Sequence, residues 1–136
     1  MLQISKKVEY GLIAIRHMAL QKNSCCTTTK EISEKYGISH NLLAKVMQAL
    51  ARNNLIVPRQ GVNGGYILTK NAHDIKIADV INAIEQVSQI ALMKCETITE
   101  ENCAISSLCT IKNPLLKIQN TINEAFQRMT LQEILF

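Results

Sequence analysis

Apolar residues near the start of the chain recur every three or four positions, which is the spacing of one helix face and predicts a helix over residues 5–20. These positions are Val8, Leu12, Ile15 and Ala19. After a polar break, Thr28 and Glu31 have the spacing of a capping box, in which each residue satisfies a backbone group of the other. This pattern predicts a short helix that runs to about Tyr36.

A glycine separates this short helix from a longer one. Gly37 can close a helix in the left-handed conformation at little cost, and Ser39 is a suitable N-cap for the next helix. That helix is predicted over His40–Asn53, with Leu43, Val46, Met47 and Leu50 inward. Two helices joined by a short turn that contains Gly are typical of a helix-turn-helix.

Two short strands are predicted next, over Leu55–Arg59 and Tyr66–Thr69. Gly61, Gly64 and Gly65 lie between them, which suits a hairpin that needs positive φ or a backbone that closely approaches another group. A helix-turn-helix followed by a hairpin is a winged helix. We therefore assign residues 1–75 to a winged helix-turn-helix DNA-binding domain.

The remaining residues, 76–136, combine helical and irregular patterns. A further amphipathic helix is predicted from Ile77, whereas residues 91–112 lack helical periodicity and predict a loop. Asn113 and Pro114 suit the cap and first position of a long C-terminal helix, and Thr130 with Glu133 predicts a second capping box. Apolar residues of the long helix alternate at spacings of three and four, as in helices that pair. They are Leu115, Ile118, Ile122, Ala125 and Met129.

Composition and charge narrow the class of protein. The 136 residues are 47% hydrophobic and 19% charged, which predicts a chain with a packed core. Together with the elements above, this gives a mainly α-helical fold with a small β-hairpin wing. No apolar run could span a bilayer and no signal peptide is recognised, so we expect a cytoplasmic protein with no membrane partner. Of the net charge of +4, residues 1–75 carry +6, and a basic front half is typical of phosphate-binding modules.

The winged-helix interpretation predicts which side chains contact double-stranded DNA. The start of the second helix of the motif contacts base edges in the major groove, and here it carries Ser39, His40, Asn41 and, one turn on, Lys45. The wing offers side chains for the minor groove, and lysines near helix starts suit phosphates. These residues are Arg59, Gln60 and Asn63 of the wing, and Lys6, Lys7 and Lys30. The alternative is a protein-interaction module with solvated lysines.

Three of the five cysteines lie in the predicted loop 91–112. Cys95, Cys103 and Cys109 are separated by seven and five residues, wider than in zinc ribbons and suited to an iron–sulfur cluster held by thiolates. Three thiolates leave a four-ligand site one short. The alternative is that they are ordinary buried cysteines. Adjacent Cys25 and Cys26 are interpreted as bystanders, with surface oxidation as the alternative.

Several motifs together resemble a known bacterial family. They are Ser5-x4-Tyr10, the run from Ile38 to Val57, Arg59-x-Gly61-x2-Gly64-Gly65-Tyr66-x-Leu68 and the three-cysteine loop. They are similar, over nearly the whole chain, to the Rrf-type winged-helix transcription regulators, which include iron–sulfur sensors of the IscR and NsrR kind. The two termini and the cysteine spacing look most like regulators of the SUF iron–sulfur assembly operon.

The resemblance implies a homodimer on a palindromic operator, paired through the long C-terminal helix. It implies that Cys95, Cys103 and Cys109 hold a [2Fe-2S] or [4Fe-4S] cluster. In IscR-like members a His serves as the fourth ligand, but Lys112 stands at that position. Other relatives use an acidic residue of the other subunit, which here is Glu9. Glu9 could instead be a surface carboxylate, and His17 a secondary ligand or a half-buried residue.

The sequence therefore predicts a DNA-binding repressor of iron–sulfur assembly genes that depends on its cluster. One alternative is a regulator of the same fold that senses nitric oxide, thiol oxidation or a protein partner. Another is a metal- or cluster-binding scaffold for protein interactions. An enzyme is not expected, because the chain lacks a Ser/His/Asp arrangement, a phosphate-binding Gly-Lys loop and a convincing carboxylate pair.

Overall fold

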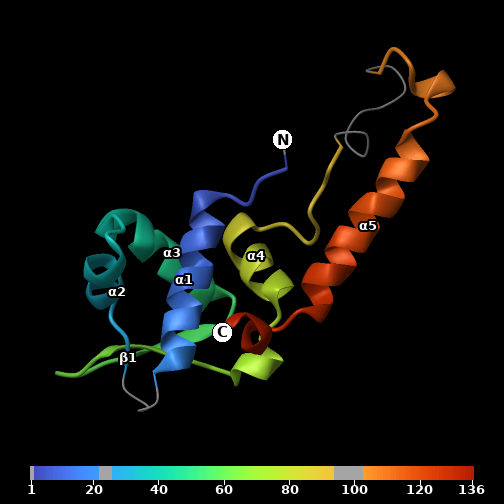
Figure 1. Ribbon diagram of the computed structural model, residues 1–136. Coiled ribbons are helices and arrows are strands. Elements are labelled where there is room, and N and C mark those ends of the chain that lie inside the picture. Colours follow the sequence, from blue (N-terminus) through green and yellow to red (C-terminus); the bar gives the residue numbers. More distant parts are fainter. Residues whose placement is uncertain (1, 22–25, 94–102) are drawn as a thin grey trace.

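The computed structural model describes residues 2–21, 26–93 and 103–136. These residues form mainly α-helices, with one antiparallel hairpin at the edge of the helices, which confirms the mainly α-helical prediction (Figure 1). The helices are α1 (Lys6–Leu20), α2 (Thr29–Tyr36), α3 (His40–Arg52), α4 (Ile77–Glu85) and α5 (Lys112–Arg128). The strands are β1 (Ile56–Arg59) and β2 (Gly65–Leu68), and short 3-10 turns are η1 (Ala72–Asp74), η2 (Ser106–Leu108) and η3 (Leu131–Ile134). No helix among the described ranges is long and apolar enough to cross a membrane.

The predicted helix-turn-helix is formed by α2 and α3. α2 ends at Gly37, whose φ of 65° and ψ of 33° are left-handed and whose N–H donates to the Ser33 carbonyl. Ser39 occupies the N-cap position of α3 as predicted, but its side chain makes no capping hydrogen bond. Of the first predicted capping box the structure shows the Thr28 half, in which the hydroxyl accepts from Glu31 N–H at 3.0 Å. The turn at Gly37 therefore separates α2 from α3, and the Ser39 hydroxyl is not used to cap α3.

The predicted wing is the hairpin β1–β2, with strand ends within one residue of the expectation. Arg59 lies opposite Gly65 in the register. Thr27 extends the sheet beyond β2, because its N–H donates to Tyr66 O at 2.9 Å and its carbonyl accepts from Tyr66 N–H at 2.8 Å. β1 is consequently the free edge of the sheet. Pro58, which has no N–H, is tolerated there because no further strand of the described residues pairs with that edge.

Two wing glycines have backbone conformations that side chains disfavour, with φ of 124° at Gly61 and 154° at Gly65. A Cβ on Gly65 would lie 2.7 Å from the carbonyl oxygen of Thr27, and a Cβ on Gly64 would lie 2.7 Å from that of Arg59. Positive φ and close backbone approach, the two reasons expected for glycine in this loop, are therefore both present.

The main hydrophobic core joins residues from both ends of the sequence. Leu131 and Leu135 are buried in it together with Ile15 of α1 and Leu50 of α3. The N–H of Leu131 also donates to the Ile75 carbonyl at 2.7 Å. After α5 the chain thus returns to the winged helix, and each fully buried aliphatic side chain there contributes about 1.5–3 kcal/mol.

The long C-terminal helix is present, but its predicted start is wrong. Ile111 occupies the N-cap position, which makes Pro114 the third helical residue and leaves Asn113 inside the first turn. The backbone of Ile111 is already helical, with φ of −102° and ψ of −15°. Pro114 is compatible with this start because the first N–H groups of a helix have no partner within it.

The predicted apolar seam of α5 remains largely exposed. Ile118 is 51% exposed and Met129 is 42% exposed. The residues of α5 that are buried are instead polar, Gln119 and Asn123. α5 therefore contacts the rest of its chain through Gln119, Asn123 and the partly buried Phe126, which packs against Ile77 and Ile81, and leaves Ile118 and Met129 exposed.

Candidate nucleic-acid interface and cysteine loop

The outward face of α3 carries the side chains predicted to contact bases. The inward residues match the prediction, because Leu43, Val46, Met47 and Leu50 are all buried. The outward residues Ser39, His40, Asn41 and Lys45 are all exposed. Gln48 is also exposed one turn beyond Lys45. The prediction from sequence missed Gln48, although its helical spacing places it on the same face.

The wing presents its predicted residues beside a hollow. Arg59, Gln60 and Asn63 are exposed. With Thr28 and Cys26 they line a space of about 880 Å³ between the wing loop and the start of α2. The hollow therefore brings a guanidinium and a hydroxyl, two groups that donate to phosphate oxygens, to one place.

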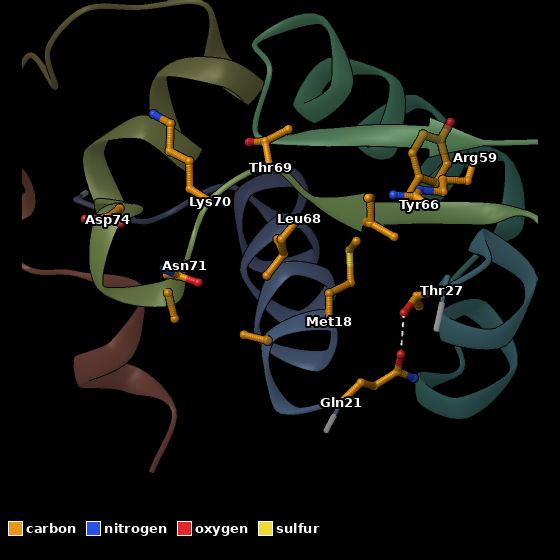
Figure 2. A pocket seen from close by; sticks show the side chains of 13 residues that line it. Met18, Gln21, Thr27, Arg59, Tyr66, Leu68, Thr69, Lys70, Asn71 and Asp74 are labelled. Carbon is orange, nitrogen blue, oxygen red and sulfur yellow. Dashed lines mark hydrogen bonds between the residues drawn. The ribbon is translucent and has the colours of Figure 1, made fainter. Parts of the chain in front are cut away.

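A second groove, of about 960 Å³, shares Arg59 with the first. It lies between the end of α1 on one side and β2, with the segment that follows β2, on the other. Figure 2 shows the hydrogen bond from the Thr27 hydroxyl to Gln21 on the wall of this groove. Lys70 and Asp74 also line it. Since their opposite charges offset one another, Arg59 supplies the net positive charge of this groove, as it does in the hollow beside the wing.

Two of the predicted phosphate-binding lysines pair with carboxylates of their own helices. Lys6 Nζ lies 2.8 Å from Glu9 Oε2, and Lys30 Nζ lies 3.9 Å from Glu34 Oε1. The hydrogen bond that Lys6 donates to the Glu9 carboxylate, together with the negative charge of Glu9, raises the pKa of Lys6 above its usual value. All four side chains are largely solvent-exposed, and exposed pairs of this kind are weak, so both lysines stay available to phosphates.

A polar network that the sequence did not reveal ties α1 to α2. His17 is 6% exposed; its Nδ1 lies 3.0 Å from the Tyr36 hydroxyl and its Nε2 lies 3.2 Å from Glu31 Oε1. Gln21 Nε2 donates to Glu31 at 2.9 Å, and Gln21 Oε1 accepts from the Thr27 hydroxyl at 2.7 Å. The network therefore reaches from the helix-turn-helix to the residue that extends the wing sheet.

The described part of the cysteine loop holds two of the three predicted ligands. Cys103 and Cys109 are half-buried, one on each side of η2. Cys95 and Cys25 lie outside the described residues. Within the described ranges no three potential ligand side chains are grouped as a metal site. The two described thiols have the chemistry that iron–sulfur clusters require.

Comparison with known proteins agrees with this architecture. The model of a protein family described as Rrf2, an iron-dependent transcriptional regulator, matches residues 4–136. CymR (YrzC), the global cysteine regulator of B. subtilis, has a TM-score of 0.78 and 22% identity, covering 99% of this chain and 97% of that chain. T. potens IscR has a TM-score of 0.75 and 26% identity, covering 98% and 86%. The oxidized form of Staphylococcus aureus CymR has a TM-score of 0.71 and 25% identity, covering 96% and 93%.

Proposed function

The chain belongs to the Rrf2 family, and from this premise we propose that it is a cytoplasmic homodimer whose operator affinity depends on an iron–sulfur cluster. Like its relatives it is a transcriptional regulator that binds DNA and not an enzyme. In this proposal it represses iron–sulfur assembly genes, so that the expression of these genes depends on the supply of clusters.

The observation that carries the proposal is that α5 connects the cysteine loop to the DNA-binding unit. Cys109 precedes α5 by three residues. Beyond the other end of α5, Leu131 and Leu135 are buried in the core that also holds the inner face of α3. A helix of this length spans about 25 Å. A change in the loop can therefore reach α3 through a single rigid element.

For DNA binding we propose that the exposed start of α3 enters the major groove. Asn41 can form two hydrogen bonds with adenine, and Lys45 can reach guanine or phosphate. Arg59 is placed on the wing to enter the adjacent minor groove. In a homodimer the two α3 helices would contact half-sites about one helical turn apart.

The proposed homodimer is supported by the uncovered seam of α5. The residues spaced by three and four, Leu115, Ile118, Ile122, Ala125 and Met129, lie beside rather than on the polar face that contacts the same chain. A stripe of apolar side chains exposed to water marks an interface. Its periodicity is that of two helices that pack along each other, which favours α5 of a second copy as the partner.

For the cluster we propose thiolates from Cys95, Cys103 and Cys109, with Glu9 of the other subunit as the fourth ligand. When bound, the cluster supplies a redox-active crosslink between these thiolates. Cys103 and Cys109 lie at the end of α5 that is remote from α1, so Glu9 of the same chain is not a neighbour (Figure 1). A carboxylate is a hard ligand in a thiolate site and exchanges readily, which suits a sensor.

Anaerobic reconstitution with iron and sulfide tests the proposal. The wild-type protein should become brown and absorb visible light, Cys103→Ala should stay colourless, and the control Cys26→Ala should remain coloured. Operator affinity is then compared between loaded and metal-free dimers in gel shifts over a range of salt. A colourless wild type, or equal affinities of the two forms, would contradict cluster-dependent regulation.

A second candidate input is oxidation of Cys26. This thiol lines the hollow beside the wing, and its Cβ would lie 3.1 Å from a Cβ built on Gly65. The S. aureus relative has been solved in an oxidized form. Peroxide should release the operator from metal-free wild type but not from Cys26→Ser if this input operates. Nitric oxide applied to the reconstituted protein tests the remaining alternative.

A further inference from the structure

Two buried amide side chains of α5 bind the main chain that leads into the cysteine loop, residues 87–93, which we call the arm. Asn123 is 8% exposed and Gln119 is 3% exposed. Asn123 Oδ1 accepts from Ile90 N–H at 2.8 Å, and Asn123 Nδ2 donates to the Ile90 carbonyl at 3.0 Å. Gln119 Oε1 accepts from Leu92 N–H at 2.8 Å. The arm is therefore attached to α5 by backbone hydrogen bonds rather than by apolar packing alone.

The spacing of these contacts fixes one register. Gln119 and Asn123 are four residues apart on α5, a rise of about 6 Å, and they meet residues of the arm that are two positions apart. The arm runs antiparallel to α5, because its later residue, Leu92, meets the earlier amide, Gln119. One turn further toward the start of α5 stands Leu115, which offers no side-chain hydrogen bond. Among the described residues, the amide contacts therefore reach Leu92, at the start of the cysteine loop.

Hydrogen bonding to the arm explains why amides stand at these positions. A buried amide is costly to desolvate unless it is hydrogen-bonded, and an apolar side chain here would leave the Ile90 and Leu92 N–H groups without these partners. The two amides are therefore the groups that hold the main chain of the arm on α5. The pair also lies beside the exposed apolar seam and not within it, so the proposed dimer does not explain it.

We propose that Gln119 and Asn123 are positioning residues that latch the arm onto α5 and so pass the state of the cysteine loop to the DNA-binding unit. This rests on the proposed function. The first end of the arm is fixed by α4, which ends at its C-cap Gln86 in the left-handed conformation, with φ of 57°. When the thiolates no longer hold the cluster, the end of the arm next to the cysteine loop loses its restraint. The hydrogen bonds of the latch then determine whether the arm stays in register with α5. A latch that is weakened by mutation uncouples the arm from α5 in both states.

Hydrogen exchange on the metal-free protein tests the contact itself. In the wild type the N–H groups of Ile90 and Leu92 should exchange slowly. Asn123→Ala should speed exchange at Ile90, and Gln119→Ala at Leu92, by about tenfold, the loss expected for one hydrogen bond. The matched control is Asn120→Ala, an exposed amide on the solvent side of α5, which should change neither. Fast exchange of both groups in the wild type would overturn the latch.

Operator binding tests the coupling. Both latch variants should keep the visible absorbance of the loaded wild type, because they leave the three thiolates in place. The ratio of loaded to metal-free affinity should fall about tenfold toward one in the latch variants and stay unchanged in Asn120→Ala. If the wild-type ratio differs from one and both latch variants keep it, the latch is overturned and the proposed function stands. If the wild-type ratio itself is one, the proposed function fails and the latch fails with it.

Discussion

The guanidinium of Arg16 donates from Nε to the main-chain oxygen of Ile134 at 3.0 Å, and so joins the first helix of the chain to its last turn. A second nitrogen of Arg16 donates to the carbonyl of Leu135. These bonds hold η3 on α1, and η3 carries Leu131 into the core. The end of α5 is therefore attached to the DNA-binding unit by hydrogen bonds as well as by burial.

Arg16→Ala should lower the free energy of unfolding by about 1–3 kcal/mol, because two carbonyls lose a charged donor. Urea denaturation followed by circular dichroism measures the change. The control is Arg128→Ala, whose side chain is exposed and 3.8 Å from Glu124, and it should change stability by less than about 0.5 kcal/mol. Equal losses in the two variants would show that the Arg16 contact is not structural.

His17→Ala should destabilise the protein by about 1–3 kcal/mol, because it empties a buried site and unpairs Tyr36 and Glu31. The visible spectrum of the reconstituted protein should not change, because the ring nitrogens are engaged within the α1–α2 network. His73→Ala is the exposed control and should alter neither stability nor spectrum. A spectral shift in His17→Ala alone would instead identify this residue as an iron ligand.

Asn41→Ala and Lys45→Ala should weaken operator binding in different ways. Asn41→Ala should cost about 1–3 kcal/mol and relax the sequence preference at one base pair, because it removes base-edge hydrogen bonds. Lys45→Ala should weaken all sequences alike and reduce the slope of log K against log salt by about one if Lys45 binds phosphate. Gel-shift titrations at several salt concentrations, on operator and on scrambled DNA, distinguish the two effects.

Gly65→Ala should displace the wing. Its φ of 154° disfavours any side chain, and the added Cβ would lie 2.7 Å from the Thr27 carbonyl oxygen, so we expect a loss of about 1–3 kcal/mol in stability. Operator affinity should fall with it. Val62→Ala, a fully exposed residue of the same loop, should leave stability unchanged. An unchanged Gly65→Ala protein would mean that the Thr27 bridge is dispensable.

Glu9→Ala should alter the Mössbauer spectrum of the reconstituted protein without removing its colour, because the proposal gives the three thiolates most of the iron coordination. Lys6→Ala removes the partner of Glu9 but no ligand, and its spectrum should match that of the wild type. Identical spectra for Glu9→Ala and wild type would leave Glu9 as a surface carboxylate and rule out its role as fourth ligand.

The helix-turn-helix and the wing were predictable because local chemistry sets their boundaries. Gly37 closes α2 in the left-handed conformation, and Thr28 caps it through its hydroxyl. Gly65 permits a backbone approach that no other residue allows. The exposed face of α3 then followed from its period alone. The assignments of DNA contacts and cluster ligands remain predictions, and Cys95 lies outside the described residues.

The features missed from the sequence depend on partners that are distant along the chain. Nothing near Asn123 indicates that it meets Ile90, and nothing near His17 indicates Tyr36. The apolar spacing of α5 drew attention to one face, while the neighbouring face with Gln119, Asn123 and Phe126 contacts its own chain. Asn113 is a good N-cap in isolation, but the helical backbone of Ile111 starts α5 earlier.

The burial of Leu131 and Leu135 among residues of α1 and α3 has a consequence for biosynthesis. Domains generally fold as units while the ribosome is still extending the chain, beginning from the N-terminus. Here residues that follow α5 fill the centre of a unit whose other residues are translated much earlier. Nascent chains that stop short of them leave that centre open, so the core of the DNA-binding unit is complete only after Leu135 has been translated.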